Sequence, residues 1–323
     1  AVQADFRLAL TGTPVENRLS ELWSIFDYLM PGYLFSYSRF REEFESPIVN
    51  REDEGASERL QKMIRPFVLR RLKQDVLSDL PDKIEKNMYA AMQGEQRQLY
   101  DAHVQRLVML LAGQSEKEFQ TAKIQILAEL TKLRQLCCDP GLLLEGYEGE
   151  SAKTQLCLEL IQNAAEGGHK VLLFSQFTTM LERLKAALKK EGIRFYSLDG
   201  STPKARRVQL VDAFNRDETQ VFCISLKAGG TGLNLTGADI VIHFDPWWNV
   251  AVQNQATDRA HRIGQKNVVT VYRLIARDTI EEKIVQLQEK KSRLAEQILG
   301  GEEMGPAALS KEALMEILEG AKA

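Results

Sequence analysis

Two arginines three residues apart, Arg259 and Arg262, carry the side chains best suited to hold a polyphosphate in this 323-residue sequence. Each guanidinium is a planar fork of N–H donors that matches two phosphate oxygens. If residues 250–260 form a helix, as their pattern predicts, an i, i+3 spacing directs both forks to one side. Exposed arginine pairs on helices are also common as solvated charges, and the spacing alone favours that interpretation.

A glycine-rich stretch, SLKAGGTGLNL at 225–235, is a second candidate for phosphate binding. Glycines let backbone amides approach an anion closely, and Lys227 adds a positive charge. The stretch is not a Walker A loop, because GK[ST] occurs nowhere in the sequence, and its glycine spacing differs from the GxGxxG dinucleotide turn. A packing turn beneath the next strand would explain the glycines equally well.

Three shorter segments have chemistry to offer. Small hydroxyls and a glycine at Thr11, Gly12 and Thr13 could donate to phosphate, although a plain turn uses the same residue types. Two adjacent tryptophans in DPWWN at 245–249 are rarely both buried, so one should meet solvent, a partner or a sugar-phosphate backbone; core packing is the alternative. DEG at 53–55 resembles an acidic magnesium motif, but its polar surroundings indicate a surface loop.

The elements that would position these loops are alternating strands and helices from residue 151 onward. This alternation predicts an α/β parallel sheet with helices on both faces, built by right-handed crossovers. Ligands of such sheets bind at loops that leave the carboxyl ends of the strands. The predicted strands are 171–175, 194–198, 221–225, 239–244 and 268–275, and the predicted helices are 177–190, 203–215 and 250–260.

The remaining segments are predicted as follows. FRLAL at 6–10 is a short buried strand with no earlier segment to pair with, so the chain has the character of a fragment. Pro31 and Gly32 end a helix that carries an apolar stripe from Leu22 to Leu29. The other predictions are charged helices over 37–72, an edge strand over 84–91, an insertion of two long helices within 95–138, a helix over 280–298, and a linker with one short helix over 300–323.

Composition and hydropathy argue against a disordered, a membrane-spanning or a secreted protein. Hydrophobic residues make up 44% and charged residues 27%, which is ordinary for a globular protein. No apolar run reaches the ~20 residues of a membrane span, and the N-terminus lacks the order of a secretion signal, so an intracellular protein is expected. Four cysteines without CxxC spacing indicate buried thiols and no metal site. Net charge is −3, but residues 151–270 carry 15 basic and 11 acidic side chains, a surplus of +4 that suits either a phosphate-binding or a solvated face.

In their order along the chain, these loops resemble the Swi/Snf-type ATPases of helicase superfamily two. LTGTP at 10–14 is similar to motif III, VLLFSQF at 171–177 to motif IV, and SLDGST at 197–202 to the short motif after it. SLKAGGTGLNL at 225–235 resembles motif V and QATDRAHRIGQ at 255–265 motif VI. RPFVLRRLKQDV (65–76), LPDK (80–83), QLCCDPGLL (135–143) and DPWWN resemble blocks typical of this family, although Val250 stands where the family has proline.

The resemblance implies a motor that hydrolyses ATP, with Mg²⁺, between two RecA-like lobes and translocates along double-stranded DNA without sequence preference, remodelling or displacing DNA-bound proteins. The Walker A and B motifs would lie in the first lobe, upstream of Ala1, so this chain alone should be inactive. It further implies that 1–36 ends the first lobe, 37–82 is a helical protrusion and linker, 83–300 is the second lobe with a helical insertion at about 94–150 and a brace helix at about 279–299, and 301–323 is a tail.

Site roles follow from the same resemblance. Arg259 and Arg262 would be arginine fingers on ATP bound by the other lobe, with Gly230, Gln255 and Asp258 also at the nucleotide. Thr11, Gly12 and Thr13 would couple the sites. The implied DNA contacts are Ser175, Gln176, Gly200, Ser201, Thr202, Lys227, Thr231, Trp248 and Asn249.

Two other functions fit parts of the sequence. A passive DNA-binding or protein-docking module would use the same basic loops with no nucleotide role. A dinucleotide-dependent enzyme on a similar sheet would bind NAD, but the required glycine spacing is absent.

Overall fold

The computed structural model describes residues 4–10, 19–51, 53–69, 80–229, 232–286, 288 and 311–319. The chain divides into two compact units, one of Ala1–Val76 with Leu287–Gly305 and one of Leu77–Gln286 with Pro306–Ala323.

The regular elements of the first unit are helices in the part that the structure describes. Its core consists of apolar side chains that successive helices contribute at helical spacing, among them Leu22, Phe26, Phe40 and Leu60. Asp53, at the acidic segment predicted as surface, caps a helix by accepting from Ala56 N at 3.0 Å. The elements are α1 (Leu19–Leu29), α2 (Tyr37–Phe40), the π-helical turn η1 (Arg41–Glu45), α3 (Ser46–Arg51), α4 (Glu54–Ile64) and the 3-10 turn η2 (Arg65–Phe67).

The strand predicted at 6–10 is not present. These residues have no regular structure, and Phe6, Leu8 and Leu10 are 81%, 66% and 90% exposed. An apolar run becomes a strand only where a neighbouring strand satisfies its backbone groups and covers its side chains. No strand of the described part pairs with this segment. The apolar pattern alone is therefore not enough to make it a strand.

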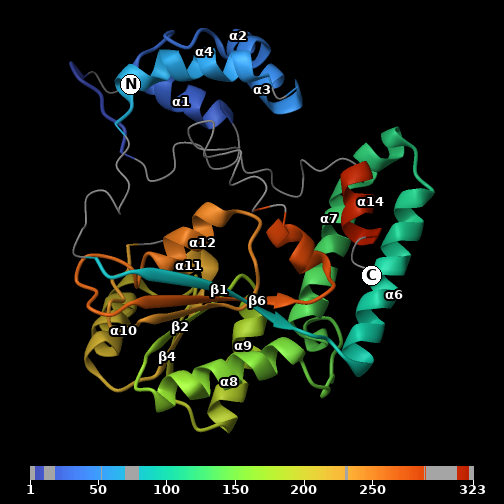
Figure 1. The fold of residues 1–323 in the computed structure, drawn as a ribbon, viewed down its shortest axis with the longest axis vertical. Helices are drawn as coiled ribbons and strands as arrows, with labels where there is room; N and C mark the ends of the chain where they lie inside the picture. The colour runs from blue at the N-terminus through green and yellow to red at the C-terminus, as the bar shows by residue number, and fades with distance from the viewer. Residues whose placement is uncertain are drawn as a thin grey trace. The chain divides into compact units, whose positions relative to one another are not determined.

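A six-stranded sheet lies at the centre of the second unit (Figure 1). Every neighbouring pair is parallel, and the strand order is β1-β6-β5-β2-β4-β3. β1 lies at one edge, as the sequence predicts. The strands are β1 (Lys83–Ala90), β2 (Val171–Ser175), β3 (Phe195–Leu198), β4 (Val221–Ser225), β5 (Ile240–His243) and β6 (Val269–Ala276).

Helices cover both faces of this sheet. Alternate residues of one strand point to opposite faces. Leu172 of β2 packs with residues of α10 (Lys204–Arg216) and α12 (Val250–Thr257), whereas Leu173 packs with residues of α8 (Ala152–Glu166) and α9 (Thr178–Lys190). This confirms the predicted α/β class. The covering helices are α8 (Ala152–Glu166), α9 (Thr178–Lys190), α10 (Lys204–Arg216), the short α11 (Leu226–Gly229) and α12 (Val250–Thr257).

A helical hairpin is inserted between β1 and α8. α6 (Gly94–Ala112) and α7 (Glu116–Cys138) are the two long helices predicted from the sequence, and a capping box at Ser115 and Glu118 starts the second one. The 3-10 turn η3 (Pro140–Leu142) follows. The C-terminal helix α14 (Lys311–Glu319) lies against α6, where Lys311 Nζ donates to Gln114 O at 2.5 Å (Figure 1).

Of the predicted helix over 280–298, residues 280–286 are helical, and most of the remainder lies outside the described residues. All four cysteines are free and buried, as expected. Within the described residues, no helix has both the length and the apolar composition needed to cross a bilayer.

A fully buried ion pair fastens the segment after β6 to the start of α8. Lys153 Nζ donates to both carboxylate oxygens of Glu281 at 2.9 Å, and both side chains are 0% exposed. Glu281 also accepts from Ala276 N at 2.9 Å. Removing one partner of such a pair leaves an uncompensated charge in the core, which is far more costly than losing a surface pair.

We therefore expect Lys153→Met to lower the free energy of unfolding by about 3–5 kcal/mol in urea denaturation. Lys153→Met with Glu281→Gln should recover part of this loss, because a neutral amide oxygen can still accept from Ala276 N. The matched control is Lys185→Met, which removes the surface pair with Glu182 and should cost less than about 1 kcal/mol. Equal losses for the two single variants would contradict the assignment.

Candidate functional site

The carboxyl ends of β2, β4 and β5 are neighbours in the sheet, because β2 lies between the other two strands. The loops that leave these strands are therefore brought to one edge. They contain the residues of motif IV, motif V and the DPWWN segment, which are far apart in the sequence. This is the edge at which parallel α/β sheets bind their ligands.

Motif V and motif VI are joined by hydrogen bonds to backbone atoms. Leu235 N donates to Arg259 O at 2.9 Å, and Arg262 Nη1 donates to Leu233 O at 3.0 Å. Gln265 is buried and donates to the carbonyls of Thr236 at 3.3 Å, Ala238 at 2.8 Å and Ala260 at 3.2 Å. The two motifs thus form one structural unit.

The two arginines do not lie on a helix, which corrects the sequence prediction. α12 ends at Thr257, and residues 258–264 form turns in which Gly264 has a φ of +100°. The buried Thr257 hydroxyl contacts His243 Nε2 at 2.9 Å, and the Arg259 carbonyl accepts from Leu235. Contacts with other segments therefore end the helix at Thr257, three residues before the end that the sequence pattern predicted.

The electrostatics of this arginine loop, Asp258 to Gln265, favour an anion. Both arginines are half-buried. Burial lowers the pKa of Arg259, and the positive charge of Arg262 lowers it further, against an opposing effect of Asp258. Two like charges that are near enough to perturb one another, and that are partly shielded from water, would be stabilised by a bound phosphate. Gln255 is half-buried on α12, and Asp258 is the residue that ends this helix.

The loop after β3 is ordered by a carboxylate and an arginine. Asp199 accepts from Ser201 N at 2.9 Å and from Ser201 Oγ at 2.6 Å, and the hydroxyl bond lowers the pKa of Asp199. Arg207 of α10 donates to Thr202 O at 2.8 Å and to Asp199 O at 3.0 Å. Gly200 and Ser201 are left exposed at the loop tip, while Thr202 is half-buried.

The side chains of Ser175, Gln176 and Asn249, three predicted DNA contacts outside the loop after β3, also make hydrogen bonds within the protein. Ser175 is 1% exposed and donates to Asp245 Oδ1 at 2.5 Å, so its hydroxyl is not available to a phosphate. Asn249 is 9% exposed and caps α12 by accepting from Val252 N at 2.9 Å. Gln176 accepts at Oε1 from Arg134 Nη1 at 3.0 Å. The side chains of Ser175 and Asn249 therefore shape the loops from inside, and the DNA contacts predicted at these residues stay predictions.

Arg134 is the residue that sequence reasoning missed. It lies on α7, outside the motifs, and it contacts both the loop after β2 and the DPWWN segment. The available signal was its place beside Leu130, Leu133 and Cys137, whose spacing marks the buried face of the helix. An arginine at such a position needs polar partners.

Several predicted residues lie outside the part of the chain that the structure describes. These are Thr11, Gly12, Thr13, Gly230 and Thr231, together with the side chain of Lys227. Trp248 is described and is half-buried, as is Trp247.

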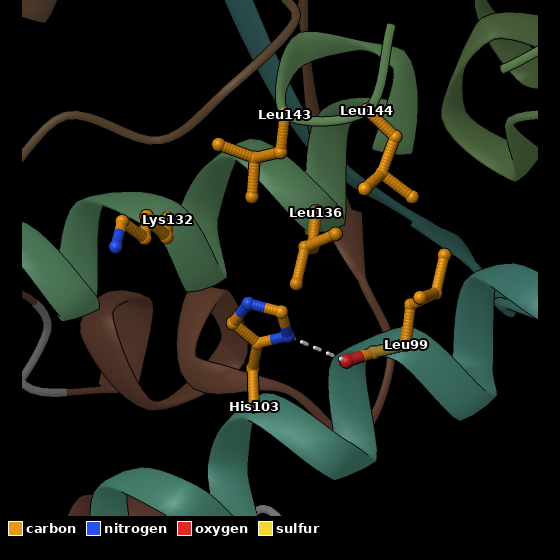
Figure 2. A pocket seen from close by; sticks show the side chains of 6 residues that line it. All are labelled: Leu99, His103, Lys132, Leu136, Leu143 and Leu144. Carbon is orange, nitrogen blue, oxygen red and sulfur yellow. Dashed lines mark hydrogen bonds between the residues drawn. The ribbon is translucent and has the colours of Figure 1, made fainter. Parts of the chain in front are cut away.

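Among the described residues, no group of three acidic, histidine or cysteine side chains is placed to hold a metal ion. An open apolar cavity of about 220 Å³ lies on the helical insertion, where His103 contacts Leu99 O at 3.1 Å (Figure 2). None of its lining residues belongs to the loops described above; they are Leu99, His103, Lys132, Leu136, Leu143 and Leu144.

Two family models match the chain: the SNF2-related domain over residues 1–142 and the helicase conserved C-terminal domain over 152–264. Among curated proteins, a putative ATP-dependent helicase/translocase of Bacillus subtilis is 42% identical over 91% of this chain and 32% of its own length. An uncharacterized ATP-dependent helicase of Mycoplasma pneumoniae is 40% identical over 98% of this chain and 30% of its own length. The chain thus spans about 30% of these relatives.

Solved structures agree with these matches. The SWI2/SNF2 ATPase core of Sulfolobus solfataricus in complex with double-stranded DNA is 37% identical, with a TM-score of 0.62 over 96% of this chain and 66% of that one. The C-terminal domain of a SWI2/SNF2 ATPase from the same organism is 33% identical, with a TM-score of 0.60 over 74% of this chain and 99% of that one. The chain therefore belongs to the SWI2/SNF2 family of helicase-type ATPases.

Proposed function

We propose that this chain is the C-terminal helicase lobe of an ATP-dependent double-stranded DNA translocase. One observation carries the proposal: two half-buried arginines lie in a loop that hydrogen bonds join to motif V. Phosphoryl transfer spreads negative charge over the equatorial phosphate oxygens, and an arginine supplied across a cleft contributes about 10³–10⁵ in rate. Arg259 and Arg262 would supply that charge.

The triphosphate of ATP fits these residues, because the arginine loop combines positive charge with partial burial. Gln255 and Asp258 would hold and orient the two arginines, with Gly230 of motif V beside the nucleotide. The described residues do not fit Mg²⁺, since they include no suitable ligand cluster; the ion would be bound mainly by the first lobe. Without a GK[ST] sequence, this chain alone is expected to release no phosphate.

Double-stranded DNA is the partner that we propose for the remaining loops. Gly200 and Ser201 are exposed at the tip of the loop after β3, and Lys204 and Arg206 are exposed at the start of α10. Thr202, Trp248, Lys227 and Thr231 complete the proposed contacts, together with the backbone at Gln176. Contacts of this kind reach the phosphate backbone and do not read base edges. Such a motor would displace or remodel DNA-bound proteins, and it would work inside the cell.

The order of the chain follows the same proposal. Residues 1–36 would end the first lobe, with Thr11, Gly12 and Thr13 coupling the two sites, and 37–82 would form a protrusion and linker. A brace over about 279–299 and a tail over 301–323 would complete the second lobe. The alternative, a passive DNA-binding or docking module, requires arginines that meet no nucleotide.

Arg259→Ala or Arg262→Ala, in the protein at its natural length, is predicted to lower DNA-stimulated ATP hydrolysis by about 10³-fold or more, because each removes charge from the transition state. The affinity for DNA should change by less than about threefold. Phosphate release and fluorescence anisotropy measure the two quantities. Arg216→Ala, an exposed arginine at the end of α10, is the matched control. Normal turnover in both loop variants would favour the passive module.

DNA affinity is predicted to be independent of base sequence and steeply dependent on salt. For three phosphate contacts, binding should weaken about 40-fold between 50 and 200 mM salt, because neutralised phosphates release counterions. Ser201→Glu should weaken binding several-fold by repelling the backbone. Asn163→Asp adds the same charge on α8, on the sheet face away from the proposed site, and should not. Titrations of two unrelated duplexes measure both effects; a tenfold preference for either duplex would contradict backbone recognition.

A further inference from the structure

Arg134 is a buried charged residue outside the proposed nucleotide and DNA contacts. It lies in the last two turns of α7, and 4% of its surface is exposed. A buried guanidinium costs several kcal/mol unless its donors find acceptors, so the identity of those acceptors indicates what the residue does.

The partners of Arg134 come from two loops at the carboxyl edge of the sheet. Nη1 donates to Gln176 Oε1 at 3.0 Å, in the loop after β2, and Nη2 donates to Pro246 O at 2.5 Å, in the DPWWN segment. These two partners are 42 and 112 residues away along the chain. The planar guanidinium of Arg134 therefore links the loop after β2 to the DPWWN segment, two loops that are far apart in the sequence.

Aromatic side chains from the same two loops surround the guanidinium. Its central carbon lies 5.8 Å from the ring centre of Phe177, 6.0 Å from that of Trp247 and 5.8 Å from that of Trp248. Cations at this distance from aromatic rings are attracted by the ring quadrupole. Arg134 thus contacts each loop through both a hydrogen bond and ring contacts.

A second link runs parallel to the first. Asp245 accepts from Ser175 Oγ at 2.5 Å and from Gln176 N at 3.3 Å, so it ties the same two loops together from inside the sheet. This carboxylate fixes the backbone at the strand ends. The Gln176 side chain and the carbonyl of Pro246, further from the strands, depend on Arg134.

Two hydrogen-bond donors in the cluster around Arg134 are buried without an acceptor in the part of the chain that the structure describes. Arg134 Nε and Gln176 Nε2 are buried without a hydrogen-bond acceptor among the described residues. Buried donors without acceptors reduce stability, and native proteins keep few of them. A purely structural role would be served better by apolar side chains, so the cost favours a role in arranging the loops.

We propose that Arg134 is a positioning residue, which holds the loop after β2 and the DPWWN segment as one surface and thereby sets the affinity for DNA without touching it. The inference rests on the proposed DNA-binding function. It assigns to the helical insertion a direct part in arranging the loops of the lobe into which it is inserted.

The first test is the exposure of the tryptophans without DNA, in the protein at its natural length. Trp23 and every tryptophan outside this chain are replaced by Phe, which leaves Trp247 and Trp248 as the only tryptophans of the protein that is measured. In this background, Arg134→Met should raise the acrylamide quenching constant at least about twofold, since the rings lose the group between them. Lys170→Met is the control, because Lys170 donates to Asp217 O at the amino end of β2, away from the loops. An unchanged quenching constant in Arg134→Met would overturn the proposal, whether or not the protein binds DNA.

The second test is the dependence of ATP hydrolysis on DNA. Arg134→Met should raise the DNA concentration for half-maximal stimulation about tenfold, while the rate at saturating DNA falls less than threefold. Gln176→Leu should act in the same direction, and the double variant should be no worse than Arg134→Met alone, because both changes break the same link. Additive effects would contradict positioning through Gln176.

Two further outcomes separate the proposal from simpler explanations. Arg134→Lys keeps the charge but not the fork, so it should resemble Arg134→Met; behaviour like the unmodified protein would show that charge alone suffices and would overturn the bridge. If Arg134→Met does not fold, Gln176→Leu carries the quenching test by itself. Quenching that changes as expected in a protein with no DNA affinity would reject the proposed function and leave the structural role of Arg134 in place.

Discussion

The hydrogen bonds between the end of motif V and the arginine loop are the constraint on which the site depends. An arginine that is to meet a phosphate must be oriented without being neutralised. Arg262 donates to the carbonyl of Leu233, a neutral acceptor that fixes direction and leaves the positive charge in place. The backbone bond from Leu235 to Arg259 holds the other residue of the pair in the same loop.

The parallel sheet arranges the other loops, because its carboxyl edge brings together loops that are remote in sequence. Polar side chains then fix the loops from within. Ser175 and Asp245 join two strand ends, Asn249 starts α12, and Arg134 spans the outer parts of two loops. Side chains that remain accessible on these loops include the exposed Ser201 and the half-buried Trp247 and Trp248.

Much of this fold could be predicted from sequence, because buried parallel strands are apolar runs; β2 and β4 have the predicted bounds, and the other strands differ by about one residue. The predictions were wrong where the structure of a segment depends on contacts with residues that are remote in sequence. FRLAL lacks a strand to pair with, and contacts at Thr257 and Arg259 end α12 early. The internal hydrogen bonds of Ser175 and Asn249 could not be predicted, because a local pattern does not reveal partners that the fold supplies. Arg134 was missed since its partners lie 42 and 112 residues away.

The most direct measurement of the central claim is the distance from the two guanidiniums to the γ-phosphate position. It requires a structure of the protein at its natural length with DNA, ADP and a fluoride mimic of the transferred phosphate. The account predicts nitrogens of both Arg259 and Arg262 within about 3.5 Å of the mimic or its neighbouring phosphate oxygens. Guanidiniums that remain several ångströms away, or that turn toward the interior of their own lobe, would contradict it.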